Sequence, residues 1–222
     1  MTAIHRHFSP AAAGMAVAIS LILSGCARDN EIDISAGVGI TTTRSLCPAV
    51  GVPTHTGDIT LFNPENSRDA AAIDVVGTIT NVRTVCNDTG ERVYVSATFD
   101  VIATRAAAGP ARDVQLPYFS TIVQGGSAVV AKDNNSVTVR FADGQTRATG
   151  TGSGGAYIDR SALVLPDDIR ERITARRRAG DQDAAVDPLS EPDIRAAVVR
   201  VTYELLIGFQ LTQDQLQYNV TR

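Results

Sequence analysis

Alternation of apolar and polar residues in two neighbouring segments constrains the fold of this 222-residue chain more than any other feature. Within 93–103 every second residue is apolar, so these side chains share one face of an extended strand. The preceding segment, 73–86, alternates in the same way and shifts its phase near 81–82, as a β-bulge would. The loop 87–90 suits a hairpin turn, so we expect two neighbouring antiparallel strands.

Short β-prone runs recur along the rest of the chain between clusters of turn residues. The further predicted strands are 59–62, 114–123, 128–131, 137–141, 161–165 and 199–211. The predicted turns are 109–110, 125–126, 133–135 and 143–144. This spacing predicts a mainly β fold, an antiparallel β-sandwich like immunoglobulin and fibronectin type III modules. The chain has no Trp, so the Cys, Trp, Cys pattern of a true immunoglobulin domain is missing.

Two segments carry the end signals of helices. Residues 166–180 begin with Pro, have acids in the first turn and arginines in the last, and end at Gly. We expect a surface α-helix there, inserted before the last long strand. That strand is predicted from the alternation over 199–211, although 190–194 resembles the start of a helix. A capping box at 212–215 predicts a short C-terminal helix.

The N-terminus has the organisation of a bacterial export signal. An apolar run over 15–23, too short to span a bilayer stably, is followed by Leu23-Ser-Gly-Cys26. This ending resembles the lipobox of bacterial lipoproteins, in which the cysteine is acylated and becomes the new N-terminus. An ordinary secretory signal or an anchor helix is the alternative. We therefore expect a signal peptide at 1–25, a flexible tether at 26–35 and a single β-sandwich domain at 36–222.

The lipobox resemblance also implies an address. Acyl chains on Cys26 would hold the mature protein firmly on a membrane without spanning it. Ala27 stands where an inner-membrane retention signal would place Asp, so the outer membrane is expected. The protein would face the periplasm, with the cell surface as the alternative. Removal of 1–25, which contains one Arg and no acid, leaves 197 residues with a net charge of −5.

Two cysteines remain after this cleavage. Cys47 and Cys86 form an even pair, and an oxidising periplasm favours a disulfide between them. The alternative is two buried free thiols.

The sequence offers little support for catalysis, a metal or a cofactor. The full chain has 20 basic and 24 acidic residues, a mild acidity that argues against nucleic-acid binding. His55 is the one histidine beyond the signal peptide, and with Asp58 nearby it fits a surface loop better than a base dyad. The string 150–155 matches G-x-G-x-x-G but precedes a strand-like run, so we interpret it as a flexible turn or surface loop. The acids in 181–187 lack the geometry of a calcium loop and are expected to be solvated.

A cluster of arginines is the strongest local charge feature. Its members lie on the predicted helix 166–180, and they are Arg170, Arg172, Arg176, Arg177 and Arg178. Their guanidinium groups suit anionic lipid, lipopolysaccharide phosphates or an acidic partner. The alternative is a solvated helix face that balances the helix dipole and the acidic connector after it.

Several segments together resemble a group of alphaproteobacterial lipoproteins that carries no established activity. They are the lipobox, Ser45-Leu-Cys-Pro-Ala-Val-Gly-Val52, Glu204-Leu-Leu-Ile-Gly-Phe-Gln-Leu211 and Tyr218-Asn219. This resemblance implies location only. We expect a non-enzymatic interaction or accessory module in envelope assembly or integrity, which docks an envelope protein through sheet edges and the basic helix.

The competing hypothesis is a lipoprotein that binds a small ligand or glycan. A deep pocket around Tyr118, Tyr157 or Tyr203 would favour it. A filled sandwich with an exposed apolar strip would favour a protein partner.

Overall fold

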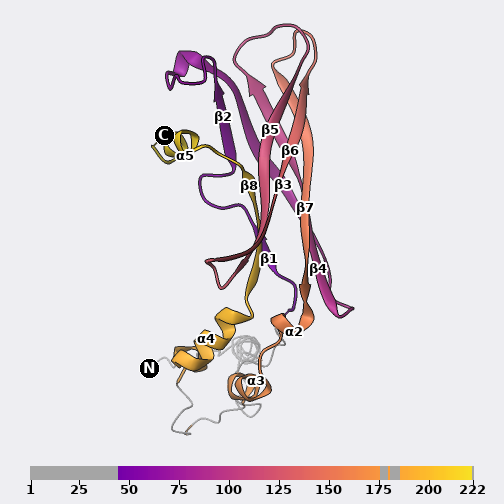
Figure 1. The fold of residues 1–222 in the computed structure, drawn as a ribbon, viewed down its shortest axis with the longest axis vertical. Helices are drawn as coiled ribbons and strands as arrows, with labels where there is room; N and C mark the ends of the chain where they lie inside the picture. Colours follow the sequence, from indigo (N-terminus) through magenta and orange to yellow (C-terminus); the bar gives the residue numbers. More distant parts are fainter. Residues whose placement is uncertain (1–44, 176–179, 181–185, 222) are drawn as a thin grey trace, which may run out of the picture. The chain divides into compact units, whose positions relative to one another are not determined.

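The computed structural model describes residues 45–175, 180 and 186–221. Apart from Gly180, these residues belong to one compact unit. Within them, eight strands form two four-stranded sheets, with the orders β1-β8-β5-β6 and β2-β3-β4-β7 (Figure 1). The first sheet contains β1 (Ala49–Gly51), β8 (Tyr203–Phe209), β5 (Arg112–Gln124) and β6 (Ala128–Phe141). The second contains β2 (Asp58–Phe62), β3 (Ile73–Asn87), β4 (Arg92–Arg105) and β7 (Arg147–Asp159).

The helices are short and lie between or after the strands. They are η3 (Ala70–Ala72), α2 (Arg160–Leu163), α3 (Asp167–Thr174), η4 (Pro188–Ser190), α4 (Pro192–Arg200) and α5 (Gln213–Thr221). Because eight strands form the two sheets and the helices are short, the expectation of a mainly β protein is confirmed.

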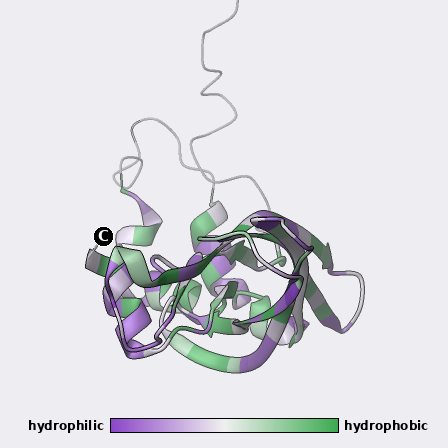
Figure 2. Ribbon diagram, turned by 90° about the horizontal axis from the view of Figure 1, so that it is seen from above, coloured by the Kyte–Doolittle hydropathy of each residue, from purple (hydrophilic) through white to green (hydrophobic). Residues whose placement is uncertain are grey.

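The two sheets face each other across one hydrophobic core, in a sandwich-like arrangement. Phe99 comes from one sheet and Phe141 and Phe209 from the other, and all three are fully buried. A Cβ atom at Gly77 of β3 would lie 2.8 Å from Leu116 of β5, so the sheets approach closely there. Hydrophobic and hydrophilic residues alternate along the strands (Figure 2), because successive side chains point to opposite faces of a sheet.

The predicted β3–β4 hairpin is confirmed in pairing and in detail. The two strands are antiparallel, and their register shifts between Thr80 and Arg83. Asn81 has a φ of 54°, in the left-handed region, which accommodates the extra residue of the bulge. The phase slip in the sequence therefore marks a real irregularity of the sheet.

The expected turn at 133–135 is wrong. Residues 128–141 form the single strand β6, in which Asp133 pairs with Ser120 and Asn135 with Tyr118. The ladder with β5 runs along the whole segment and outweighs the turn preference of Asp and Asn. The predicted turn at 125–126 is correct, and both glycines there have positive φ.

Two predicted strands are partly helical. The segment 161–165 falls largely in α2, because β4 starts at Arg92, which pairs with Asp159, and offers no further partner. The predicted strand 199–211 is shortened to β8, and its first residues belong to α4 or to the turn after it. Pro192 at the start of α4 and the buried Ile194 and Ala197 on one face fix this helix.

The helix expected at 166–180 is shorter than predicted. In α3 the backbone leaves the helical region at Ala175, two residues after Ile173. Ile169 and Ile173 bury against Ile194 and Ala197 of α4. The small α3–α4 core supports only this length. The predicted C-terminal helix is confirmed as α5, where Thr212 and Gln215 exchange the two hydrogen bonds of a capping box.

The first strand departs from the expected antiparallel order. β1 pairs in parallel with β8 through three residue pairs, from Ala49 with Glu204 to Gly51 with Leu206. The predicted disulfide is confirmed: Cys47, just before β1, is bonded to Cys86 of β3, with a Cα–Cα distance of 6.0 Å. This bond links the first sheet's entry segment to the second sheet.

Candidate interaction surface

The first half of β6 is an open sheet edge. β6 is the last strand of its sheet, and β5 is its hydrogen-bonded neighbour. All residues from 128 to 136 are exposed, whereas Val137, Val139 and Phe141 further along are buried. An edge strand presents backbone N–H and C=O groups that another strand can pair with.

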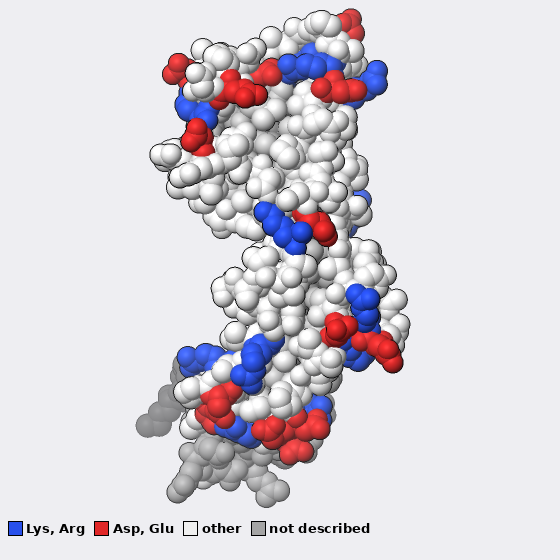
Figure 3. All heavy atoms as spheres, in the orientation of Figure 1, with Lys and Arg blue, Asp and Glu red and all other residues white. Residues whose placement is uncertain are grey.

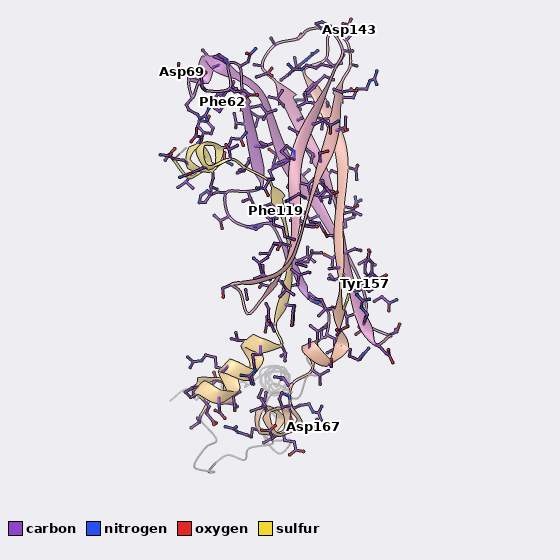
Figure 4. The ribbon with its side chains drawn as sticks, viewed as in Figure 1. Phe62, Asp69, Phe119, Asp143, Tyr157 and Asp167 are labelled. Carbon is purple, nitrogen blue, oxygen red and sulfur yellow. A yellow bond between two sulfur atoms is a disulfide. The ribbon has the colours of Figure 1, made fainter. Side chains whose placement is uncertain are left out.

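The side chain that normally protects such an edge is turned away from it. Lys132 is the only lysine of the chain. Its Nζ donates to Oε1 of Gln210 at 2.8 Å and lies 5.1 Å from the ring centre of Phe119. Phe119 lies on the outer face of this sheet and Tyr157 on the outer face of the other (Figure 4). The ammonium group thus lies over the sheet instead of projecting from its edge, where lysines discourage strand pairing.

The edge of β7 is covered where it passes β6. The Tyr118 hydroxyl of β5 donates to the Ser153 carbonyl at 2.7 Å and accepts from the Ser153 N–H at 3.4 Å. A Cβ atom at Gly150 would lie 2.6 Å from Val137 of β6. Both backbone groups of Ser153 are therefore satisfied across the two sheets.

Two of the remaining edge strands are short, and other elements hold parts of the rest. β1 has three residues, and β2 has five. On β2, Nδ2 of the buried Asn219 in α5 donates to the carbonyls of His55 and Asp58, at 2.9 and 2.8 Å. β3 continues beyond β2 after Thr78, and there Cys86 is bonded to Cys47. Among the described strands, 128–136 of β6 is exposed along its whole length, and β3 beyond Thr78, exposed at 81–85, is a second stretch without a strand partner on one side.

A small apolar hollow opens beside this edge, where β6 and β7 diverge. It has a volume of about 200 Å³ and is lined by residues that include Ile122, Ala131, Ala156, Ile158 and Tyr203. Pockets that bind small ligands usually measure about 300–1,000 Å³. The hollow is too small for most ligands but can accept one side chain.

A larger depression of about 520 Å³ lies at the ends of β4 and β5. Its walls include the ion pair of Arg112 and Asp74, at 2.9 Å, and none of its lining residues is aromatic. Of the three tyrosines expected to mark a ligand pocket, Tyr118 is buried and hydrogen-bonded, and Tyr157 and Tyr203 border only the smaller hollow.

The Gly-rich string at 150–155 is not a flexible loop, and this prediction is wrong. It forms the middle of β7, paired with β4 over its whole length. A Cβ atom at Gly152 would collide with the Phe99 ring, and one at Gly154 would lie 2.5 Å from Ser120. Glycines in a strand often mark such close approaches. These residues let β7 pack tightly on the core and on β5.

The described arginines of the predicted cluster are held in ion pairs within the chain. Arg170 contacts Asp167 at 2.6 Å, and Arg172 contacts Asp193 at 2.6 Å and Glu191 at 2.5 Å. Arg176, Arg177 and Arg178 lie outside the described residues. Blue and red atoms alternate around α3 and α4 (Figure 3), so the described part of this region is not a patch of one charge.

Arg172 joins α3 to α4 and makes that contact sensitive to acid. Its hydrogen bond lowers the pKa of Asp193 below the ordinary value of 3.8. Because the folded-state pKa is depressed, the stabilisation is complete above pH 3.8 and is lost as the pH falls through the folded value. We expect Asp193→Asn to lower the stability of the full chain at pH 7, and the difference from wild type to vanish in strong acid. Urea denaturation at a series of pH values measures it, and a difference that persists in strong acid would contradict the assignment.

The other predicted polar features have structural roles. His55 is exposed, with a positive φ, and its carbonyl accepts from Asn219. Asp187 caps η4 by accepting from Leu189 N–H at 2.9 Å, and the acids at 181 and 183 lie outside the described residues. Across the described residues, no group of three His, Cys, Asp or Glu could hold a metal ion, and no helix is long and apolar enough to span a membrane.

One buried charge was missed by the sequence analysis. Arg105 is 5 % exposed, and its guanidinium donates to the carbonyls of Gly109, Pro110, Ala142 and Gln145. It ties the β4–β5 loop to the β6–β7 turn. The apolar alternation over 93–103, continued by two residues, places residue 105 on the buried face. This alternation is the sequence signal that could have predicted the buried arginine.

Comparison of the chain with known proteins gave no match to a family model, a curated protein or a solved structure.

Proposed function

We propose that this protein is a lipid-anchored, non-enzymatic interaction module on the periplasmic side of the outer membrane, acting in envelope assembly or integrity. The lipobox ending at Cys26 and Ala27 after it support the anchor and the address. The disulfide between Cys47 and Cys86 is consistent with an oxidising compartment. As part of the same proposal, the fold is like that of immunoglobulin and fibronectin type III modules. The chain is likewise proposed to be similar to the alphaproteobacterial lipoproteins.

The open edge of β6 carries the interaction part of this proposal. Residues 128–136 form one strand with a free side, and their lysine lies back over the sheet. An extended peptide can add to such an edge by main-chain hydrogen bonds, which is a common mode of protein recognition. The alternative, binding of a small ligand or glycan, has less support, because the hollow beside Tyr203 measures only about 200 Å³ and the larger depression of about 520 Å³ has no aromatic residue in its lining.

A crosslinking experiment in intact envelopes tests the proposal. A photo-crosslinking amino acid is placed at Val130 or Asn134 on the edge, and at Thr98 or Thr104 in the outer face of the other sheet as matched controls. We expect one protein adduct of defined mass from the edge positions and at least about tenfold less from the controls, because an added strand lies within reach of the edge alone.

The same experiment in the Cys26→Ser background tests the anchor. The protein should move from the membrane to the soluble fraction and lose the adduct if its partner is membrane-bound. Equal adducts from edge and control positions, or none from either, would contradict the interaction module. Retention of the Ser variant in the outer membrane would contradict the anchor.

A further inference from the structure

The two residues at the centre of the open β6 edge point to opposite faces of the sheet. Ala131 pairs with the buried Ile122, and Lys132 pairs with Thr121. Directly opposed residues in antiparallel strands share a face. Ala131 therefore lies on the inner face, beside the hollow, and Lys132 lies on the outer face, over Phe119.

A strand added to this edge would meet a different environment on each face. Its residue opposite Ala131 would point toward the hollow, which Ala156, Ile158 and Tyr203 also line. A large apolar side chain suits that position. Its residue opposite Lys132 would share the outer face with the Lys132 side chain. The ammonium group has three donors, one of which is used by Gln210, and the flexible four-carbon stem lets it turn from Phe119 toward the added strand. A carboxylate suits that position.

A second copy of this chain does not provide that combination. Two β6 strands related by a two-fold axis pair antiparallel with like faces on the same side, so even-numbered residues oppose even-numbered residues. Lys132 would then face Val130, Lys132, Asn134 or Ser136 of the other copy, depending on register. None of these is an acid, and no two-fold register pairs Lys132 with Asp133.

We propose that the β6 edge binds an extended segment of another protein in which an acidic residue is directly followed by a large apolar residue. The added strand runs antiparallel to β6, the commoner arrangement in sheets. An antiparallel added strand runs opposite to β6. The residue of the added strand that follows the one opposite Lys132 therefore lies opposite Ala131. This inference rests on the proposed function and specifies the chemistry of the partner.

Binding of synthetic peptides to the purified full chain tests the motif. The probe is a fluorescein-labelled peptide of sequence Thr-Val-Glu-Leu-Thr-Val-Thr, and the variants carry Lys in place of Glu or Ala in place of Leu. By anisotropy we expect the Glu peptide to bind about two- to fivefold more tightly than the Lys peptide, the range of one cross-strand charge pair. Lys132→Glu should reverse that preference without loss of fold, checked by circular dichroism.

A second variant tests the inner face independently. Ala156→Leu fills the hollow, so it should abolish the preference for Leu over Ala in the peptide and leave the charge preference intact. Arg140→Glu, a charge change further along β6, is the matched control and should change neither preference. Peptides that bind with no charge preference, or a preference that Lys132→Glu leaves unchanged, would overturn the motif. Adducts from the edge in envelopes would then still support the interaction module, whereas their absence would overturn the proposed function itself.

Discussion

Replacing Phe99 by Ala should lower the free energy of unfolding by about 3–5 kcal/mol, the usual range for a large aromatic side chain lost from a core. Phe99 is 1 % exposed and meets the Tyr118 ring edge-on, with 5.0 Å between ring centres. Its ring also fills the space over Gly152. Urea denaturation of the purified full chain measures the change.

The contact between Phe99 and Gly152 makes a sharper test. In the wild type, Gly152→Ala should cost about 1–3 kcal/mol by overpacking, because the added methyl collides with the ring. In the Phe99→Ala background the same substitution should cost much less, since the space is then empty. Gly90→Ala is the matched control, because its nearest neighbours would be backbone atoms at 3.7 Å or more. Additive effects of the two substitutions would contradict the packing described for β7.

Loss of the disulfide should have an effect of similar size. Replacing Cys47 and Cys86 together by Ser opens a crosslink with a sequence separation of 39. In the chain-entropy model this costs about 3–4 kcal/mol, because the unfolded chain gains freedom. Urea denaturation of the full chain, with and without a thiol reductant, measures the loss.

The reductant provides the internal control for this second prediction. It should destabilise the wild type to about the level of the double Ser variant, and it should leave that variant unchanged. A wild-type denaturation midpoint that does not respond to full reduction would show that the bond contributes nothing to folding stability.

Local patterns predicted the hairpin of β3 and β4 well. The alternation over 93–103 and the phase slip at 81–82 depend only on side chains within each strand, and the structure has the same faces and the same bulge. The disulfide followed from cysteine number and compartment. The capping box of α5 was also local, since its two hydrogen bonds join Thr212 and Gln215, three residues apart.

Features that depend on distant strands could not be predicted in the same way. Asp133, Asn134 and Asn135 have turn preferences, yet β5 holds them in a ladder. In the sequence, the glycines of 150–155 indicated flexibility. In the structure, Phe99 and Ser120 occupy the space that larger side chains at Gly152 and Gly154 would need. At 199–200 the apolar alternation predicted a strand. These residues belong to α4, whose buried face packs on α3. Sheet edges were expected to dock a partner, but local patterns do not identify the edge, because strand order depends on pairing between distant segments.

The position of the disulfide also sets the path of mechanical load through the fold. An anchor at Cys26 would pull on the chain from its N-terminal side, and Cys47 is reached before β1. The covalent bond passes that tension directly to Cys86 in β3, a fifteen-residue strand paired with β4. The three parallel pairs between β1 and β8 are thereby shielded from the pull. In a protein tethered at Cys26, β1 would resist detachment from β8, and β3, the longest strand, would bear the force.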